Sequence, residues 1–145
     1  SPNAEGTAPQ LPPTETFPSG GSVWNTVAGI GGSPMLLRGG AIRISDVEEL
    51  ISINNATSRP RTAIGYTANG RIVLLAVEGD NSSAGYLGIN LADLASMMLS
   101  LGCTDAINLD GGGSTSMVIG NRLTVRPGDN GVERPVASAL LIKQR

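Results

Sequence analysis

The sequence predicts an α+β fold in which a mixed, largely antiparallel sheet carries about two helices packed on it. The Asn-Gly pair at 69–70 joins two β-rich runs, which is typical of a tight hairpin and therefore of antiparallel pairing. Residues 91–101 have apolar side chains at helical spacing. The 20 glycines and 9 prolines among 145 residues indicate that turns are frequent.

The chain divides into two parts by composition. Residues 1–22 hold five of the nine prolines and only Leu11 and Phe17 as large apolar groups, so they bury too little surface to offset the entropy of ordering. We therefore expect a Pro-rich extended arm or linker at 1–22 and one folded domain at 23–145.

The first half of the domain is expected to contain two short strands, a short helix and the hairpin. They are expected at 35–37, 41–44, 45–54 and, for the hairpin, at 61–67 with 71–77. Ser45 or Asp46 would cap the helix, and Glu48 and Glu49 would place negative charge in its first turn.

The second half is expected to contain the longer helix and the remaining strands. Asn90 is a suitable N-cap for the helix at 91–101, and Gly102 is a suitable stop. The remaining strands are expected at 106–109, 115–119, 123–125 and 135–143.

Composition excludes several functional classes. With 10 basic and 12 acidic residues, the chain lacks the positive footprint of a nucleic-acid or anionic-membrane binder, so no nucleic-acid partner is expected. No apolar run is long enough for a membrane span. The absence of histidine and the presence of one cysteine exclude a Ser/His/Asp triad, a Cys/His pair and a histidine-ligated zinc within this chain. Any catalysis must therefore rest on carboxylates, arginines, hydroxyls and backbone amides.

The most informative segment is the glycine-rich stretch that follows the predicted strand at 106–109. Gly111, Gly112 and Gly113 come directly after Asp110 and before Ser114. Consecutive glycine amides can form a nest that binds an anion, with Asp110 beside it. A glycine bulge that Asp110 merely caps explains the same residues equally well.

Two arginines beside prolines are the other candidates. Arg61 and Thr62 open the hairpin, and Glu133 and Arg134 precede the last predicted strand. Such arginines are usually surface charges, but two that converge would suit a phosphate group, and Glu133 would supply a second carboxylate. Residues 129–131, Asp-Asn-Gly, favour a turn over a metal loop.

Together these groups suit a sugar joined to phosphate. When a glycosyl phosphodiester is hydrolysed, the leaving phosphate is already acidic, so it needs little general-acid assistance and histidine is dispensable. One carboxylate must act at the anomeric carbon, and cations or amides must hold the phosphate.

The chain resembles the phosphodiester glycosidase family across residues 22–145, in five blocks that occur in order. The blocks are AGIGGSPML at 28–36, PRTAIGYT at 60–67, LADLA at 91–95, NLDGGGS at 108–114 and ERPVA at 133–137. The resemblance implies hydrolysis of a phosphodiester-linked amino sugar, such as N-acetylglucosamine, on a phosphorylated glycan or polymer. It also implies export, and hence an extracellular or cell-envelope location.

By motif position, the resemblance places three groups of residues along the cleft. They are Arg61 and Thr62, then Asp110 with Gly111, Gly112, Gly113 and Ser114, and finally Glu133 with Arg134. From the chemistry, we assign Asp110 as nucleophile or base, Glu133 as its partner, and the arginines and amides as the phosphate site. The sequence identifies no cofactor, although Asp110, Asp129 and Glu133 could give oxygen ligands to a divalent cation.

The sequence departs from the family at its beginning, because family domains carry further strands before the Gly-Gly-x-Pro block. We therefore expect the chain to correspond to the C-terminal portion of a domain, with the N-terminal portion as a potential partner. Two alternatives to an enzyme remain. One is a noncatalytic module that binds sugar phosphates or anionic glycans, and the other is a purely structural domain.

Overall fold

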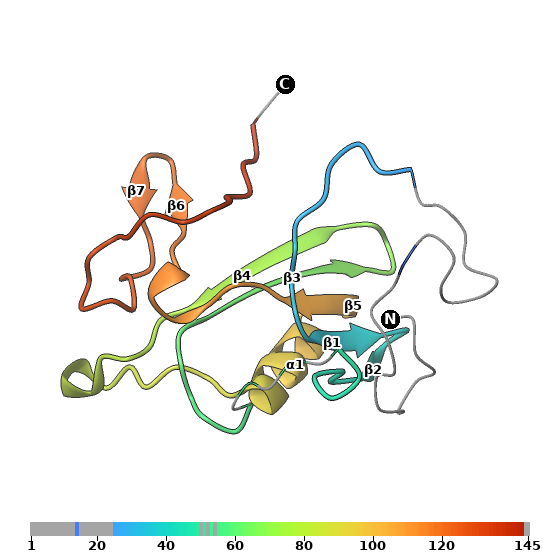
Figure 1. Ribbon diagram of the computed structural model, residues 1–145, viewed down its shortest axis with the longest axis horizontal. Coiled ribbons are helices and arrows are strands. Elements are labelled where there is room, and N and C mark those ends of the chain that lie inside the picture. Colours follow the sequence, from blue (N-terminus) through green and yellow to red (C-terminus); the bar gives the residue numbers. More distant parts are fainter. Residues whose placement is uncertain (1–13, 15–24, 50, 52, 54, 144–145) are drawn as a thin grey trace.

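The computed structural model describes residues 14, 25–49, 51, 53 and 55–143, which form a five-stranded sheet, one main helix and a separate two-stranded hairpin (Figure 1). The predicted arm at 1–22 lies outside the described residues, apart from an exposed Thr14. The predicted α+β class with a largely antiparallel sheet is confirmed, although there is one α-helix in the described residues where two were expected.

The main sheet has the strand order β2-β1-β5-β3-β4, and every neighbouring pair is antiparallel. Its strands are β1 (Met35–Arg38), β2 (Ala41–Ile42), β3 (Arg61–Thr67), β4 (Ile72–Val77) and β5 (Cys103–Asn108). The predicted hairpin is confirmed as β3 and β4, with Tyr66 opposite Ile72 beside the turn.

The register of the sheet gathers several loops at one end. Met35 of β1 and Ala63 of β3 pair with Ile107 and Asn108 of β5, so β1 and β3 start where β5 finishes. Because β4 is antiparallel to β3, it finishes there too. We call this the loop end, on the left in Figure 1; it comprises residues 31–34, 57–60, 78–81 and 109–115.

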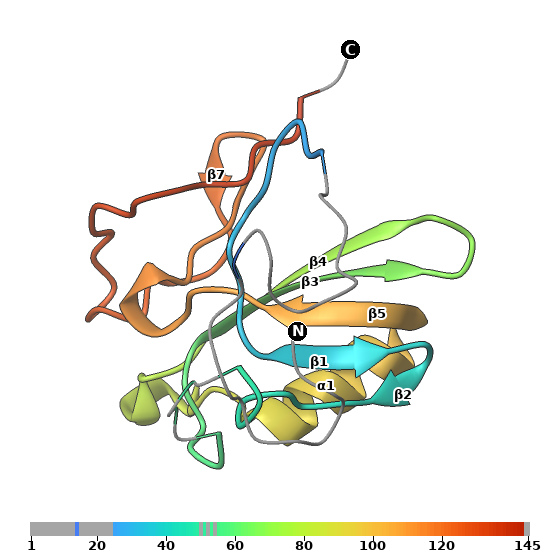
Figure 2. The ribbon, with the colours of Figure 1, turned by 45° about the vertical axis from the view of Figure 1, so that its right-hand side comes forward.

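The helix α1 (Leu91–Ser100) forms as predicted and covers one face of the sheet (Figure 2). The side chain of Asn90 accepts a hydrogen bond from the backbone N–H of Asp93 at 2.8 Å, which caps the helix. Gly102 follows the last turn with φ of +84°, a left-handed conformation that glycine adopts without strain.

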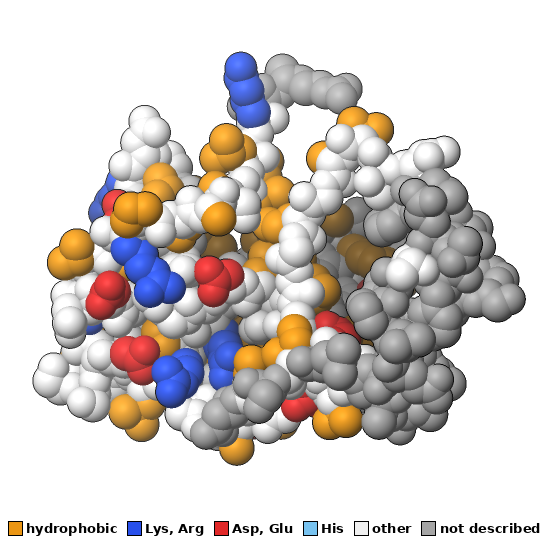
Figure 3. Space-filling view, in the orientation of Figure 1, with side chains coloured by type: hydrophobic (Ala, Val, Ile, Leu, Met, Phe, Trp, Pro, Cys, Tyr) orange, Lys and Arg blue, Asp and Glu red, His pale blue; other side chains and the backbone are white. Residues whose placement is uncertain are grey.

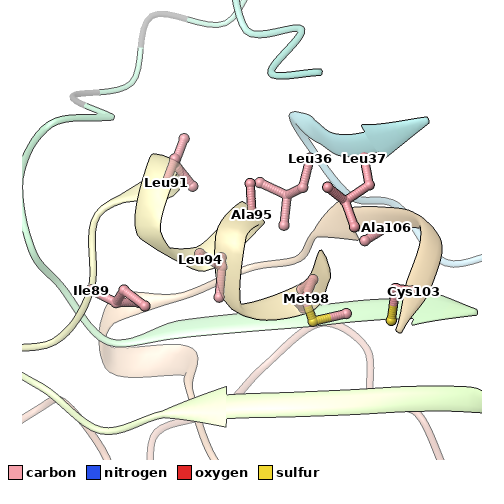
Figure 4. Close-up of a cluster of buried hydrophobic side chains, with 10 residues drawn as sticks. Leu36, Leu37, Ile89, Leu91, Leu94, Ala95, Met98, Cys103 and Ala106 are labelled. Atoms are coloured by element: carbon pink, nitrogen blue, oxygen red, sulfur yellow. The ribbon is translucent and has the colours of Figure 1, made fainter. Parts of the chain in front are cut away.

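The hydrophobic core lies between α1 and the sheet. Figure 4 shows the buried side chains of the helix facing those of β1 and β5. The helix contributes Leu91, Leu94, Ala95 and Met98, all fully buried. Gly65 of β3 leaves room for Met98, since a Cβ at position 65 would lie 2.8 Å from the Met98 Cε and 2.7 Å from the Asp105 carbonyl oxygen.

The prediction of a short helix at 45–54 is wrong. Residues 46–49 form turns, and 50, 52 and 54 lie outside the described part of the chain. The N–H of Glu49 bonds the carbonyl of Ser45 at 3.0 Å as in a helix, but the N–H of Ile51 reaches back five residues to Asp46 at 3.1 Å. The side chain of Ser45 accepts a hydrogen bond from the N–H of Met35, the first residue of β1, and that of Glu49 accepts one from the Ser33 hydroxyl, so this turn is fixed against the sheet.

The last strand expected at 135–143 is also wrong, since this segment is irregular and exposed throughout. Its apolar pattern favours a strand, but its backbone has no hydrogen bond to a strand in the described residues, and Leu141 is 87% exposed. The strands expected at 115–119 and 123–125 form a shorter hairpin, β6 (Val118–Ile119) and β7 (Arg122–Leu123).

The core makes a stability prediction with an internal control. Leu94→Ala should lower the free energy of unfolding by about 2–5 kcal/mol, because it leaves a cavity beneath α1. Leu99→Ala on the same helix should cost much less, since Leu99 is 38% exposed whereas Leu94 is fully buried. Urea unfolding followed by circular dichroism measures both, and equal losses would contradict this account of the core.

Candidate active site

Pro60 lies at the centre of the loop end. The backbone N–H of Gly112 donates to its carbonyl at 2.9 Å. A Cβ on Gly79 would lie 2.7 Å from the Pro60 nitrogen, and a Cβ on Gly128 would lie 2.7 Å from its Cγ. Three separate loops therefore meet at one proline, two of them through glycines that leave room for it and one through a hydrogen bond.

The glycine-rich segment forms a tight turn, η2 (Gly112–Ser114), immediately after β5. Asp110 is exposed at the start of this turn, and its Oδ1 accepts a hydrogen bond from the N–H of Gly111 at 2.9 Å. The N–H groups of Gly112, Ser114 and Thr115 also bond within the protein. Of the five amides at 111–115, that of Gly113 alone has no hydrogen bond to the described residues, which leaves it for a ligand.

Arg134 lies against this turn. Its Nη2 and Nε atoms donate to the Ser114 Oγ at 2.7 and 3.3 Å. A Cβ on Gly113 would lie 3.1 Å from the Arg134 Nη1, so the guanidinium packs directly on the Gly113 backbone. The structure thus brings together Arg134, Ser114 and the Gly113 amide, three of the groups that the sequence suggested for phosphate.

Asp129 is a neighbour of this site that sequence reasoning placed in a turn. It does lie in a turn, at 128–131, but its Cβ would be 3.2 Å from a Cβ on Gly113. The Asp-Asn-Gly pattern indicates only the turn. The position arises because Gly128 packs on Pro60 and because the N–H of Arg126 bonds the Glu78 Oε2 at 3.2 Å.

Arg61 and Thr62 point to opposite faces of the sheet, as adjacent strand residues must. Arg61 is only 7% exposed, and its guanidinium donates to the carbonyls of Thr57 at 3.3 Å and Ile89 at 3.4 Å. Burial, together with the nearby charge of Arg59, lowers its pKa. Thr62 instead bonds the hydroxyl of Thr115 at 3.4 Å. The donors of Arg61 are therefore directed to two carbonyls and not to the glycine turn.

Glu133 is exposed and makes no hydrogen bond or ion pair with the described residues. Its role as the partner of Asp110 stays a prediction.

Charged side chains gather near the loop end. Figure 3 shows acidic and basic side chains on the left of the face in view, the side on which the loop end lies in Figure 1.

Glu49 holds the segment before β1 in place, which its sequence position did not indicate. Its Oε2 accepts from the Ser33 hydroxyl at 2.7 Å, and its Oε1 accepts from the Met35 N–H at 3.0 Å and from the Ser45 hydroxyl. A carboxylate with three donors is well satisfied although it is half-buried. Glu49 therefore anchors one wall of the loop end.

Asn108 connects this wall to Asp110, the proposed catalytic carboxylate. The N–H of Ser33 donates to the Asn108 carbonyl at 2.7 Å, and the Asn108 Nδ2 donates back to the Ser33 carbonyl at 2.7 Å. Asn108 is 5% exposed, and its Oδ1 has no partner in the described residues. These bonds fix the backbone two residues before Asp110, so Glu49, Ser33 and Asn108 together position the end of β5.

Two further observations concern the expected cofactor and membrane classes. Within the described residues, no three His, Cys, Asp or Glu side chains cluster as a metal site would require. No described helix has the length and apolar character needed to cross a bilayer. A divalent cation at Asp110, Asp129 and Glu133 stays a prediction.

The family model for phosphodiester glycosidase matches residues 6–143, so the chain belongs to that family. Bovine N-acetylglucosamine-1-phosphodiester alpha-N-acetylglucosaminidase is 34% identical over 111 residues, which cover 70% of this chain and 20% of that protein. The human enzyme of that name is 40% identical over 70 residues, or 48% of this chain and 13% of that protein. The chain thus spans about a fifth of the bovine relative's length.

A similar fold is found in solved structures. The zebrafish N-acetylglucosamine-1-phosphodiester alpha-N-acetylglucosaminidase catalytic domain, auto-inhibited by its pro-peptide, gives a TM-score of 0.59 at 29% identity. That match covers 74% of this chain and 37% of the zebrafish chain. A putative exported protein from Burkholderia pseudomallei gives 0.50 at 39% identity, covering 53% of this chain and 14% of that one.

The packing on Pro60 makes a prediction with a matched glycine control. Gly128→Ala should lower the free energy of unfolding by about 1–3 kcal/mol, because its Cβ would clash with two groups of the loop end. Those groups are the Gly112 carbonyl oxygen and the Pro60 Cγ, each at 2.7 Å. Gly31→Ala should have little effect, since its Cβ would meet nothing within 4 Å. Thermal unfolding measures both variants, and an unperturbed Gly128→Ala would contradict this packing.

Proposed function

We propose that the chain hydrolyses a sugar-1-phosphodiester at the loop end. The observation that carries this proposal is the placement of the Arg134 guanidinium on Ser114 and Gly113, directly after the exposed carboxylate of Asp110. This arrangement offers a cation, a free amide and a carboxylate on one turn. Family membership and the names of the bovine and zebrafish relatives support the same reaction class.

The phosphate would bind to Arg134 and to the N–H of Gly113. Guanidinium and amide donors suit phosphate oxygens, and Ser114 restrains the guanidinium before substrate arrives. Arg61 and Thr62 would not contact the phosphate and would instead support the loops around it, since the fold directs their side chains to Thr57, Ile89 and Thr115.

The chemical step would break the bond between the anomeric carbon and the phosphate oxygen. The electron pair leaves with the phosphate, which Arg134 and the Gly113 amide stabilise as its charge grows. Water supplies the new hydroxyl group at the anomeric carbon. Asp110 acts either as the nucleophile at that carbon or as the base that accepts the proton of water, and Glu133 is its proposed partner.

The proposed substrate is an N-acetylglucosamine-like sugar linked through phosphate to a glycan or polymer. Support comes from the printed names of the bovine and human relatives, which specify that sugar in a 1-phosphodiester. The proposed location is extracellular or in the cell envelope, because a similar solved structure is described as a putative exported protein. The second proposed partner is the N-terminal portion of a family domain, since this chain covers 37% of the zebrafish chain.

The first functional prediction separates an enzyme from a binding module. Asp110→Asn should lower the release of free sugar from a synthetic N-acetylglucosamine-1-phosphodiester by at least about 100-fold, the usual contribution of a catalytic base. The substitution keeps an oxygen for the Gly111 N–H, so the turn should be retained. Asp93→Asn, at the exposed start of α1, should leave the rate unchanged.

Three outcomes of this assay would be informative. Turnover that persists in Asp110→Asn would contradict the assigned role of Asp110. Turnover only after the N-terminal portion of a family domain is supplied would show that this chain holds part of the site. Binding of the phosphodiester without turnover in either case would overturn hydrolysis in favour of the noncatalytic module.

The second functional prediction concerns the phosphate group. Arg134→Ala should weaken binding of inorganic phosphate by about tenfold or more, because it removes a charge-assisted contact. Arg122→Ala, on the exposed strand β7, should not change it. Isothermal titration calorimetry measures both affinities, and an equal effect of the two substitutions would show a general charge effect in place of a site.

A further inference from the structure

The outer edge of β4 has no neighbouring strand in the described residues. β4 is the last strand in the order β2-β1-β5-β3-β4, so its pairing with β3 uses one side of its backbone. Among the described residues, no backbone group outside the sheet bonds to residues 72–77. The other side of β4 therefore presents N–H and C=O groups to which a further strand could bond.

This edge lacks the features that usually prevent strand addition. Natural edge strands are protected by charged side chains, by proline, by a bulge or by their short length. The six residues of β4 are Ile-Val-Leu-Leu-Ala-Val, all of them apolar. Their register with β3 continues without a bulge from Ile72 to Val77. The opposite edge strand, β2, has only two residues and is therefore protected by its length.

The segment at 135–143 has the complementary deficiency. It has the apolar pattern of a strand and carries no charge from Val136 to Ile142. Residues 139–142, Ala-Leu-Leu-Ile, are four consecutive exposed apolar residues, with Leu141 87% and Ile142 77% exposed. Its backbone makes no backbone hydrogen bond within the described part of the chain. Exposed apolar runs of this kind are typical of surfaces that contact another molecule.

The position of this segment makes it accessible to another molecule. Arg134, immediately before it, is held on the Ser114 hydroxyl by a bond of 2.7 Å. From there the segment runs outward, apart from β4 of the same chain, in both views of the ribbon (Figures 1 and 2). A free strand edge and a free strand-like segment therefore occur at separate places on one chain.

We propose that two copies of this chain associate through these elements, with the 135–143 segment of one copy added as a strand to the β4 edge of the other. Each element supplies what the other lacks, since β4 has an unused edge and the segment has unused backbone groups. Main-chain hydrogen bonds give such strand addition its affinity, and the apolar side chains add to it. Two reciprocal contacts of this kind would close a symmetric dimer.

The side chains of both elements favour a second copy over a charged partner. Neither β4 nor residues 136–142 carries a charge, so an acidic or basic partner would find no opposite charge there. The whole chain has a net charge of −2, so repulsion between two copies is small. An added segment would also continue the apolar surface of β4.

The two faces of β4 show how that surface would continue. The side chains on one face pack against the core; they are Val73, Leu75 and Val77. Ile72 and Leu74 therefore lie on the other face, and Ile72 is 61% exposed. Because side chains alternate along a strand, Leu140 and Leu141 of an added segment would lie on opposite faces of the sheet. Each would then meet apolar neighbours from β4.

The test is sedimentation equilibrium of the chain over a range of concentrations. We expect the apparent mass to rise from that of a monomer toward that of a dimer. Leu141→Lys and Ile72→Lys should each raise the dissociation constant by at least about tenfold, because each places a charge in an apolar contact. Both side chains are exposed in a single copy, so the variants should stay folded, which thermal unfolding checks.

Ile119→Lys is the matched control. Ile119 lies on β6 and is 62% exposed, close to the 61% of Ile72, and it belongs to neither proposed element. Its replacement should leave the association unchanged. An equal effect of all three lysine substitutions would show nonspecific apolar adhesion and would overturn the proposal.

An equimolar mixture of the two interface variants tests which elements meet. The Leu141→Lys copy keeps an intact β4 edge, and the Ile72→Lys copy keeps an intact segment. The mixture should therefore associate more strongly than either variant alone, through one contact in place of two. If Ile72→Lys alone associates like the unaltered chain, the segment does not pair with β4 and the proposal is overturned. A chain that stays monomeric at every concentration would overturn it as well, whatever the outcome of the hydrolysis assay.

Discussion

The geometry of the loop end depends on how closely three loops approach Pro60. A side chain at Gly79, Gly111 or Gly128 would have to share space with the proline. The N–H of Gly112 is also joined to the Pro60 carbonyl by a hydrogen bond. The loop after β4, the turn after β5 and the segment that carries Arg134 therefore share one reference point. The positions of Asp80, Asp110 and Arg134 follow from it, because each lies a few residues from a point of contact.

Elements determined by local patterns could be predicted from the sequence. The hairpin of β3 and β4 follows from an Asn-Gly turn between β-rich runs, and α1 follows from its apolar spacing, with Asn90 as cap. The segment at 135–143 has an equally strong apolar pattern and no strand. A strand requires a partner as well as a pattern, and the sequence of one segment carries no information about an available sheet edge.

The candidate site could be predicted only in part, because residue type does not determine direction. The sequence grouped Arg61 with Arg134, but alternation along β3 directs Arg61 to the carbonyls of Thr57 and Ile89. The sequence pattern favours a helix turn at Glu49, whereas in the structure its carboxylate holds Ser33 beside β5. The sequence pattern at Asp129 indicates a turn, and only the packing of distant loops places this residue beside Gly113.

The antiparallel register places the candidate functional groups at one end of the main sheet and the β3–β4 turn at the other. Every strand boundary that carries a candidate group faces the loop end, while the β3–β4 turn at 68–70 lies at the opposite end and is exposed. Exposed hairpin tips commonly accept insertions, since no buried backbone is disturbed. This turn is therefore the place where a fluorophore, an affinity tag or a surface-attachment group could be introduced while the candidate site stays open to solution.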